Sequence, residues 1–93
     1  MGELELGYKG YIDFLSNFKR HLDPSTFDEL GNVEYGQWEI CFEALLHQLM
    51  KLNRMAISLD ISTVTQLAKE AEVLSEGILD PDTWKQFNEW LNA

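Results

Sequence analysis

Hydrophobic residues recur at intervals of three and four along the chain, most clearly between Tyr35 and Leu52. At about 100° per residue, the apolar side chains of this segment form one stripe, as in a helix that faces a core. The stripe consists of Trp38, Cys41, Phe42, Leu45, Leu49 and Leu52. The opposite side is mixed and carries Glu39, Glu43, His47, Ile40 and Met50. This helix therefore either packs on two sides within the fold or presents an acidic surface with apolar contacts to a partner.

The same spacing predicts a first helix from about Glu3 to His21. Its start lies as late as Tyr8 if Gly7 and Gly10 weaken the first turns. The residues expected on its buried face are Tyr8, Tyr11, Leu15, Phe18 and Leu22.

Two Asp-Pro pairs, at 23–24 and 80–81, predict two more helix starts, because Asp is a good N-cap and Pro is favoured at the first helical position. They introduce a short helix from about Pro24 to Gly31 and a last helix from about Pro81 to Leu91. The last helix is expected to bury Trp84, Phe87 and Leu91.

The middle of the chain predicts two further helices joined by an extended link. The third helix is expected from about Gly36 to Asn53. The link MAISLDIS alternates like a strand but has no convincing partner strand, and a fourth helix follows it, capped by one of its polar residues and ending near Gly77. The candidate caps are Ser58, Asp60 and Ser62. We therefore expect an all-α fold, a compact bundle of about five short helices, as a single domain over residues 1–93.

Charge narrows the classes of partner. Sixteen Asp and Glu residues against seven Lys and Arg give a net charge of -9. Nucleic acid and anionic membranes both require neutralising basic groups, so neither is expected as a partner, whereas a basic protein is favoured. The simpler alternative is that the charge serves solubility alone.

One cysteine cannot form an intramolecular disulfide, and no targeting segment or membrane span is evident, so the sequence predicts a cytoplasmic protein.

The sequence lacks a recognisable catalytic, cofactor or metal constellation. Glu43 and His47 lie one turn apart and could share a proton or a metal, but no second pair completes a site. Cys41 falls on the apolar stripe with acidic neighbours that raise a thiol pKa, so it is a poor nucleophile. We expect no enzyme activity, no cofactor and no metal.

Recognition by surface contacts remains. Carboxylates along the start of the third helix and on the preceding short helix form a candidate acidic strip, to which aromatic and aliphatic side chains add apolar anchors. The candidate partner-binding residues are Asp28, Glu29, Glu34, Tyr35, Glu39, Ile40, Glu43, His47 and Met50.

The order of these elements resembles that of Maf-type immunity proteins, small acidic helical proteins encoded beside polymorphic bacterial toxins. The resemblance rests on HLDP at 21–24, YGQWEICFEALLHQL at 35–49, an Ile-Ser link at 57–58 and DPDTWKQF at 80–87. It spans most of the chain and is one of pattern, without an invariant chemical motif.

This resemblance implies a protein that neutralises a cognate toxin domain, often a nuclease, by direct binding inside the producing cell, either over the active site of the toxin or at a neighbouring surface. A nuclease is basic where it binds phosphate, so an acidic inhibitor suits it. The alternative is an acidic helical adaptor or regulatory module unrelated to toxins, with homo-oligomerisation through an exposed aromatic such as Trp90.

Overall fold

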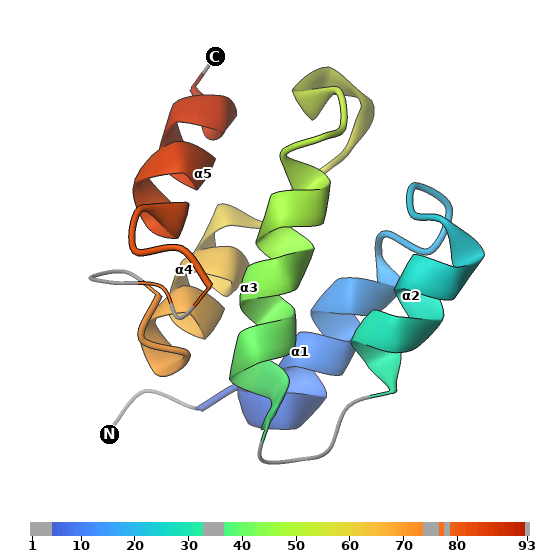
Figure 1. Ribbon diagram of the computed structural model, residues 1–93, viewed down its shortest axis with the longest axis horizontal. Coiled ribbons are helices and arrows are strands. Elements are labelled where there is room, and N and C mark those ends of the chain that lie inside the picture. The colour runs from blue at the N-terminus through green and yellow to red at the C-terminus, as the bar shows by residue number, and fades with distance from the viewer. Residues whose placement is uncertain (1–4, 33–36, 74–76, 78, 93) are drawn as a thin grey trace.

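A computed structural model of the protein describes residues 5–32, 37–73, 77 and 79–92, and among them the chain forms five α-helices and no strand (Figure 1). The helices are α1 (Gly7–Ser16), α2 (Pro24–Gly31), α3 (Trp38–Leu49), α4 (Ile61–Glu70) and α5 (Thr83–Leu91). A 3₁₀ turn, η2 (Arg54–Ala56), lies between α3 and α4. The predicted bundle of about five short helices is confirmed. None of the described helices is long and apolar enough to cross a membrane.

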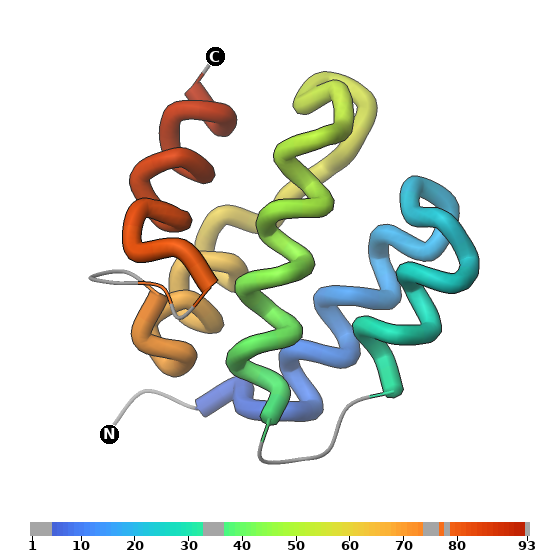
Figure 2. The backbone as a smooth tube through the Cα atoms, in the orientation of Figure 1, coloured from blue at the N-terminus to red at the C-terminus, as the bar shows by residue number. Residues whose placement is uncertain are grey.

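Helix α3 is the centre of the arrangement. It contacts α1, α2, α4 and α5. Helices α1 and α2 run side by side on one side of α3, whereas α5 lies on the other side and α4 lies behind (Figure 2). A helix with neighbours on so many sides must bury more than one narrow stripe.

The core is one cluster of buried side chains to which all five helices contribute. Most of the predicted stripe on α3 is buried, although Cys41 and Leu52 are only partly buried. Tyr11 of α1 is fully buried, and its ring meets that of Phe42 edge to face at a centroid distance of 6.4 Å. Its hydroxyl donates a hydrogen bond of 2.6 Å to the carbonyl of Leu30 in α2. Aromatic packing and a satisfied polar tip thus join three helices.

Helix α1 begins with a cap that comes from α4. The carboxylate of Glu70 accepts hydrogen bonds from the backbone N–H groups of Leu6 at 2.9 Å and Gly7 at 2.7 Å. Burial raises the pKa of Glu70, but these two bonds and a third from the side chain of Gln66 outweigh it, and the net shift is downward. Helix α1 ends at Ser16, earlier than predicted, and residues 17–22 continue as turns.

Two of the predicted caps are present. The side chain of Asp23 accepts a hydrogen bond of 3.1 Å from the Ser25 N–H at the start of α2. The side chain of Asp60 likewise accepts a hydrogen bond of 3.3 Å from the Thr63 N–H at the start of α4. Each of these short helices starts at a residue whose side chain replaces a missing intrahelical acceptor.

The predicted end of the fourth helix near Gly77 is wrong. Helix α4 ends at Glu70 because Glu72 adopts a left-handed backbone conformation, with φ of 61°. The Val73 N–H then bonds back to the Ala68 carbonyl at 2.9 Å, as in a Schellman motif. A residue other than glycine thus ends the helix.

The predicted start of the last helix at Pro81 is also wrong by two residues. The Asp80 carbonyl accepts the Thr83 N–H at 3.1 Å, and the Asp80 side chain accepts the Asp82 N–H at 2.9 Å. These bonds close a turn around Pro81, and α5 begins only at Thr83.

On the third helix, the predicted start at Gly36 lies outside the described residues. The helix ends at Leu49, after which turns lead to Leu52.

Candidate functional site

Glu43, expected on an exposed acidic strip, is fully buried. Its Oε2 atom accepts hydrogen bonds from the backbone N–H groups of Leu79 at 3.0 Å and Asp80 at 2.9 Å. The same oxygen lies 2.7 Å from the hydroxyl of Thr83. The expectation is therefore wrong, because the carboxyl group is turned toward the segment before α5, whose backbone donors replace the water it would otherwise bind.

His47 joins this cluster from one turn further along α3. Its Nε2 atom lies 2.9 Å from the hydroxyl oxygen of Thr83, and its ring is partly exposed. The hydroxyl also lies 2.8 Å from the Asp80 carbonyl. A hydroxyl has one proton, so at any moment it donates to only one of its neighbours, and the direction of its bond with His47 depends on the tautomer of the imidazole ring.

This polar cluster joins α3 to the start of α5. Thr83 is fully buried, so a substrate has no access to its hydroxyl. The pKa of Asp80 is lowered by hydrogen bonds from Asp82 and Gln86, with a smaller contribution from His47. Burial raises the pKa of the Cys41 thiol, which disfavours the thiolate. In the described part of the chain, no three His, Cys, Asp or Glu side chains are placed to hold a metal ion.

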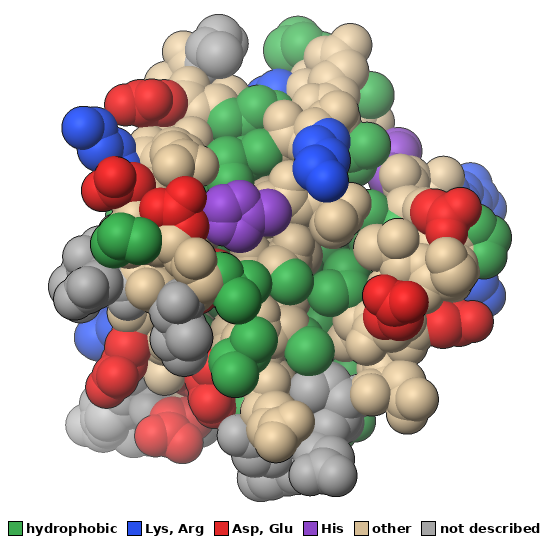
Figure 3. All heavy atoms as spheres, in the orientation of Figure 1, with side chains coloured by type: hydrophobic (Ala, Val, Ile, Leu, Met, Phe, Trp, Pro, Cys, Tyr) green, Lys and Arg blue, Asp and Glu red, His purple; other side chains and the backbone are tan. Residues whose placement is uncertain are grey.

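The outward face of α3 is the first candidate binding surface. Ile40 is 43% exposed, and Ala44, His47 and Lys51 follow it at helical spacing with partial or full exposure. Figure 3 shows hydrophobic side chains gathered over α3 in the middle of this side of the molecule, with acidic side chains over α2 and near α5 on either side. Leu79, whose backbone N–H donates to Glu43, is another exposed hydrophobic residue, with 55% of its surface exposed. We call Ile40, Ala44, His47 and Lys51 the α3 face.

The other predicted partner-binding residues that the structure describes are spread over different elements. Asp28 and Glu29 are exposed on α2. Glu39 is partly buried beside the start of α1, where it lines a hollow with Glu70. Met50 is partly buried against the core. The remaining two predicted residues, Glu34 and Tyr35, lie outside the described residues.

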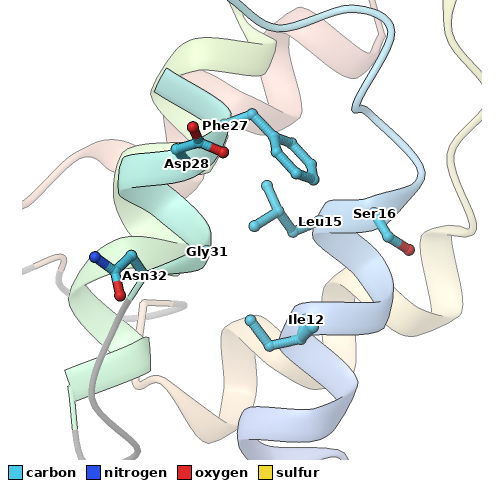
Figure 4. Close-up of a pocket in the computed structure, with 7 residues that line it drawn as sticks. All are labelled: Ile12, Leu15, Ser16, Phe27, Asp28, Gly31 and Asn32. Atoms are coloured by element: carbon cyan, nitrogen blue, oxygen red, sulfur yellow. The ribbon is translucent and has the colours of Figure 1, made fainter. Parts of the chain in front are cut away.

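A groove between α1 and α2 is a second candidate surface, and sequence reasoning missed it. Its volume is about 580 Å³ (Figure 4). Seven residues line it: Ile12, Leu15, Ser16, Phe27, Asp28, Gly31 and Asn32. The signal in the sequence was Gly31 next to an apolar face, which was interpreted only as the end of a helix. Asp28 is the one lining residue that was also a predicted partner-binding residue.

Comparisons of the chain with family models, with curated proteins and with solved structures found no match.

Proposed function

We propose that this chain is an immunity protein that binds a cognate bacterial toxin domain, a basic nuclease, and neutralises it by direct contact. The proposal rests on the resemblance to Maf-type immunity proteins and on the net charge of -9, which complements a protein surface that binds phosphate. No catalytic residue is required, since an inhibitor acts by covering the toxin.

The observation that carries the proposal is the α3 face with its acidic surroundings. Ile40 leaves 43% of its surface exposed on the central helix. Figure 3 shows hydrophobic side chains over α3, with acidic side chains over α2 and near α5 on either side. Apolar anchors within a polar rim are typical of protein interfaces. The carboxylates speed encounter with a basic partner and select it, and the apolar side chain adds affinity after contact.

The test is co-expression with the toxin domain encoded immediately upstream. The wild-type chain is expected to restore growth and to co-purify with the toxin in a one-to-one complex. Ile40→Lys is expected to lose both effects. Ile61→Lys is the matched control, because Ile61 is 47% exposed on α4 and the charge change is the same.

Each outcome has a distinct meaning. If the wild-type chain neither restores growth nor co-purifies with this toxin, the proposed function is wrong. If Ile40→Lys and Ile61→Lys both protect as well as the wild type, the function stands and the α3 face is not the interface. Both variants are exposed, so their thermal unfolding is expected to match that of the wild type.

The adaptor alternative predicts self-association through Trp90. That side chain is partly buried: its indole N–H donates to the Leu52 carbonyl at 3.2 Å, and the Arg54 guanidinium carbon lies 5.8 Å from its ring centroid. These contacts occupy Trp90 within the chain. Size-exclusion chromatography with light scattering separates the two functions, since the immunity function predicts a complex formed with the toxin and the adaptor a homo-oligomer.

A further inference from the structure

The groove between α1 and α2 has an apolar interior that stays partly exposed among the described residues. Figure 4 shows Ile12 and Leu15 of α1 and Phe27 of α2 pointing into the space between the two helices. Leu15 is buried at the bottom, whereas Ile12 and Phe27 are partly buried and keep apolar surface toward solvent. A groove of this kind, between two neighbouring helices, suits the apolar face of a third helix.

Gly31 sets the width of the groove near the end of α2. A Cβ atom at this position would lie 3.5 Å from Cδ2 of Leu15, an ordinary contact distance, so the fold tolerates a side chain here. Glycine instead leaves this part of the groove without a side chain, and the groove as a whole has a volume of about 580 Å³, within the usual range of binding pockets.

Charge determines what this groove attracts. Asp28 lines the α2 wall, and Glu29 follows it on the surface. On the α1 side, Lys9 and Asp13 are both exposed near Ile12, and neither lines the groove. A segment in the groove therefore meets one carboxylate and no cation among the lining residues, within a chain of net charge -9. This pattern disfavours a second copy of the acidic chain and favours a basic segment.

From the apolar interior and the acidic wall, we infer that the groove binds an amphipathic helix of the toxin partner, with its apolar stripe on Ile12 and Phe27 and its Lys or Arg residues facing Asp28 and Glu29. The inference extends the proposed function by adding a second contact surface to the α3 face, and its toxin partner rests on that function. Binding of a basic helix is testable without the toxin.

The probe is a helical peptide of about 16 residues with leucine at every third or fourth position and lysine along one flank. A second peptide has glutamate in place of each lysine. Amide chemical shifts of the isotope-labelled protein are recorded during titration. The lysine peptide is expected to shift the amide signals of Ser16, Gly31 and Asn32, and the glutamate peptide is not. Absence of binding, or shifts confined to other helices, would overturn the inference.

Two variants of the groove and one control variant test the inference. Asp28→Lys is expected to weaken binding of the lysine peptide roughly tenfold, because an attraction becomes a repulsion. Glu89→Lys, an exposed position on α5 with the same charge change, is expected to leave binding within about twofold. Gly31→Leu places a side chain in the groove and is expected to abolish binding while the helical circular dichroism is retained. Equal binding by Asp28→Lys and Glu89→Lys would show that net charge, not the groove, attracts the peptide.

Two further measurements separate this inference from the proposed function. If the wild type fails to neutralise the toxin yet binds the lysine peptide at the groove, the function is wrong and the groove is still a binding site for basic helices. If the wild type neutralises the toxin and Asp28→Lys and Gly31→Leu do so equally well, the groove is not part of the interface.

Sedimentation of the protein alone is expected to show a monomer. A dimer that Gly31→Leu dissociates would make a second copy the occupant and overturn the inference.

Discussion

The Oε2 atom of Glu43 lies 2.7 Å from the hydroxyl oxygen of Thr83, and neither side chain has exposed surface. This pair joins the central helix α3 to the first residue of α5. A buried carboxyl group in this position stabilises the fold and has no surface that a partner could contact. Loss of binding after Glu43→Lys would therefore report misfolding, whereas Ile40→Lys reports on the surface itself.

Glu43→Ala is expected to lower the free energy of unfolding by about 3 kcal/mol, because two backbone N–H groups and the Thr83 hydroxyl lose a buried acceptor. Glu43→Gln keeps an oxygen at the site and is expected to lose only about 1 kcal/mol. Urea denaturation followed by circular dichroism measures both. Glu89→Ala, on the exposed side of α5, is the control and should change stability by less than about 0.5 kcal/mol. A loss for Glu43→Ala as small as that of the control would contradict the role of the pair.

Gly77→Ala is expected to destabilise the protein by about 2 kcal/mol, since a Cβ there would collide with the Asp80 carbonyl oxygen and the Glu43 carboxyl group. Gly31→Ala is the matched control, since its Cβ would meet Leu15 at an ordinary distance within a helix. Alanine there should leave the melting temperature unchanged or raise it. The two melting temperatures, measured by differential scanning calorimetry, should move apart, and a parallel shift would show that Gly77 has more room than its surroundings indicate.

Glu72→Gly is expected to stabilise the protein by about 1 kcal/mol. Glu72 is exposed and has φ of 61°, a conformation that costs an L-residue energy but suits glycine. Glu72→Ala separates the backbone effect from the loss of charge, because alanine keeps the Cβ atom and gains nothing from the left-handed conformation. If alanine stabilises as much as glycine in urea denaturation, the gain comes from charge.

Stability is expected to fall in acid partly through Glu70. The hydrogen bonds from Leu6, Gln66 and Gly7 outweigh burial and lower the pKa of Glu70 in the folded protein. The unfolded chain then binds the proton more readily, so the contribution is complete above the ordinary glutamate pKa of about 4.3 and is lost as the pH falls through the lower, folded value. The melting temperature measured from neutral to acidic pH should decline less steeply for Glu70→Gln than for the wild type. An unchanged acid slope in that variant would rule out the contribution.

The helical pattern and the cap chemistry predicted most of the fold. Spacing identified much of the buried faces of α1 and α3 but missed Phe14 and Leu46, which are also buried. The aspartates at 23 and 60 begin helices by the expected hydrogen bonds. Helix ends were harder to predict, because they depend on backbone conformation that composition does not determine. Glu72 ends α4 in a conformation usually taken by glycine, and Asp80 closes a turn where a helix start was expected.

The candidate site was less predictable, because a helical pattern assigns faces without knowing what packs against them. Glu43 was assigned to the surface since it is charged and lies off the main stripe. The segment at 79–83, distant in sequence, returns to bury it with three hydrogen-bond donors. Ile40, on the same helix, stays 43% exposed. Only the tertiary arrangement distinguishes these two positions.

The cap on α1 bears on how the protein is made. Glu70 follows Gly7 by 63 positions, so the acceptor for the first amides of α1 is synthesised long after the helix it caps. Until α4 has left the ribosome, the nascent chain has an uncapped first helix and an incomplete core. The complete bundle can therefore close only after residue 70 has been synthesised.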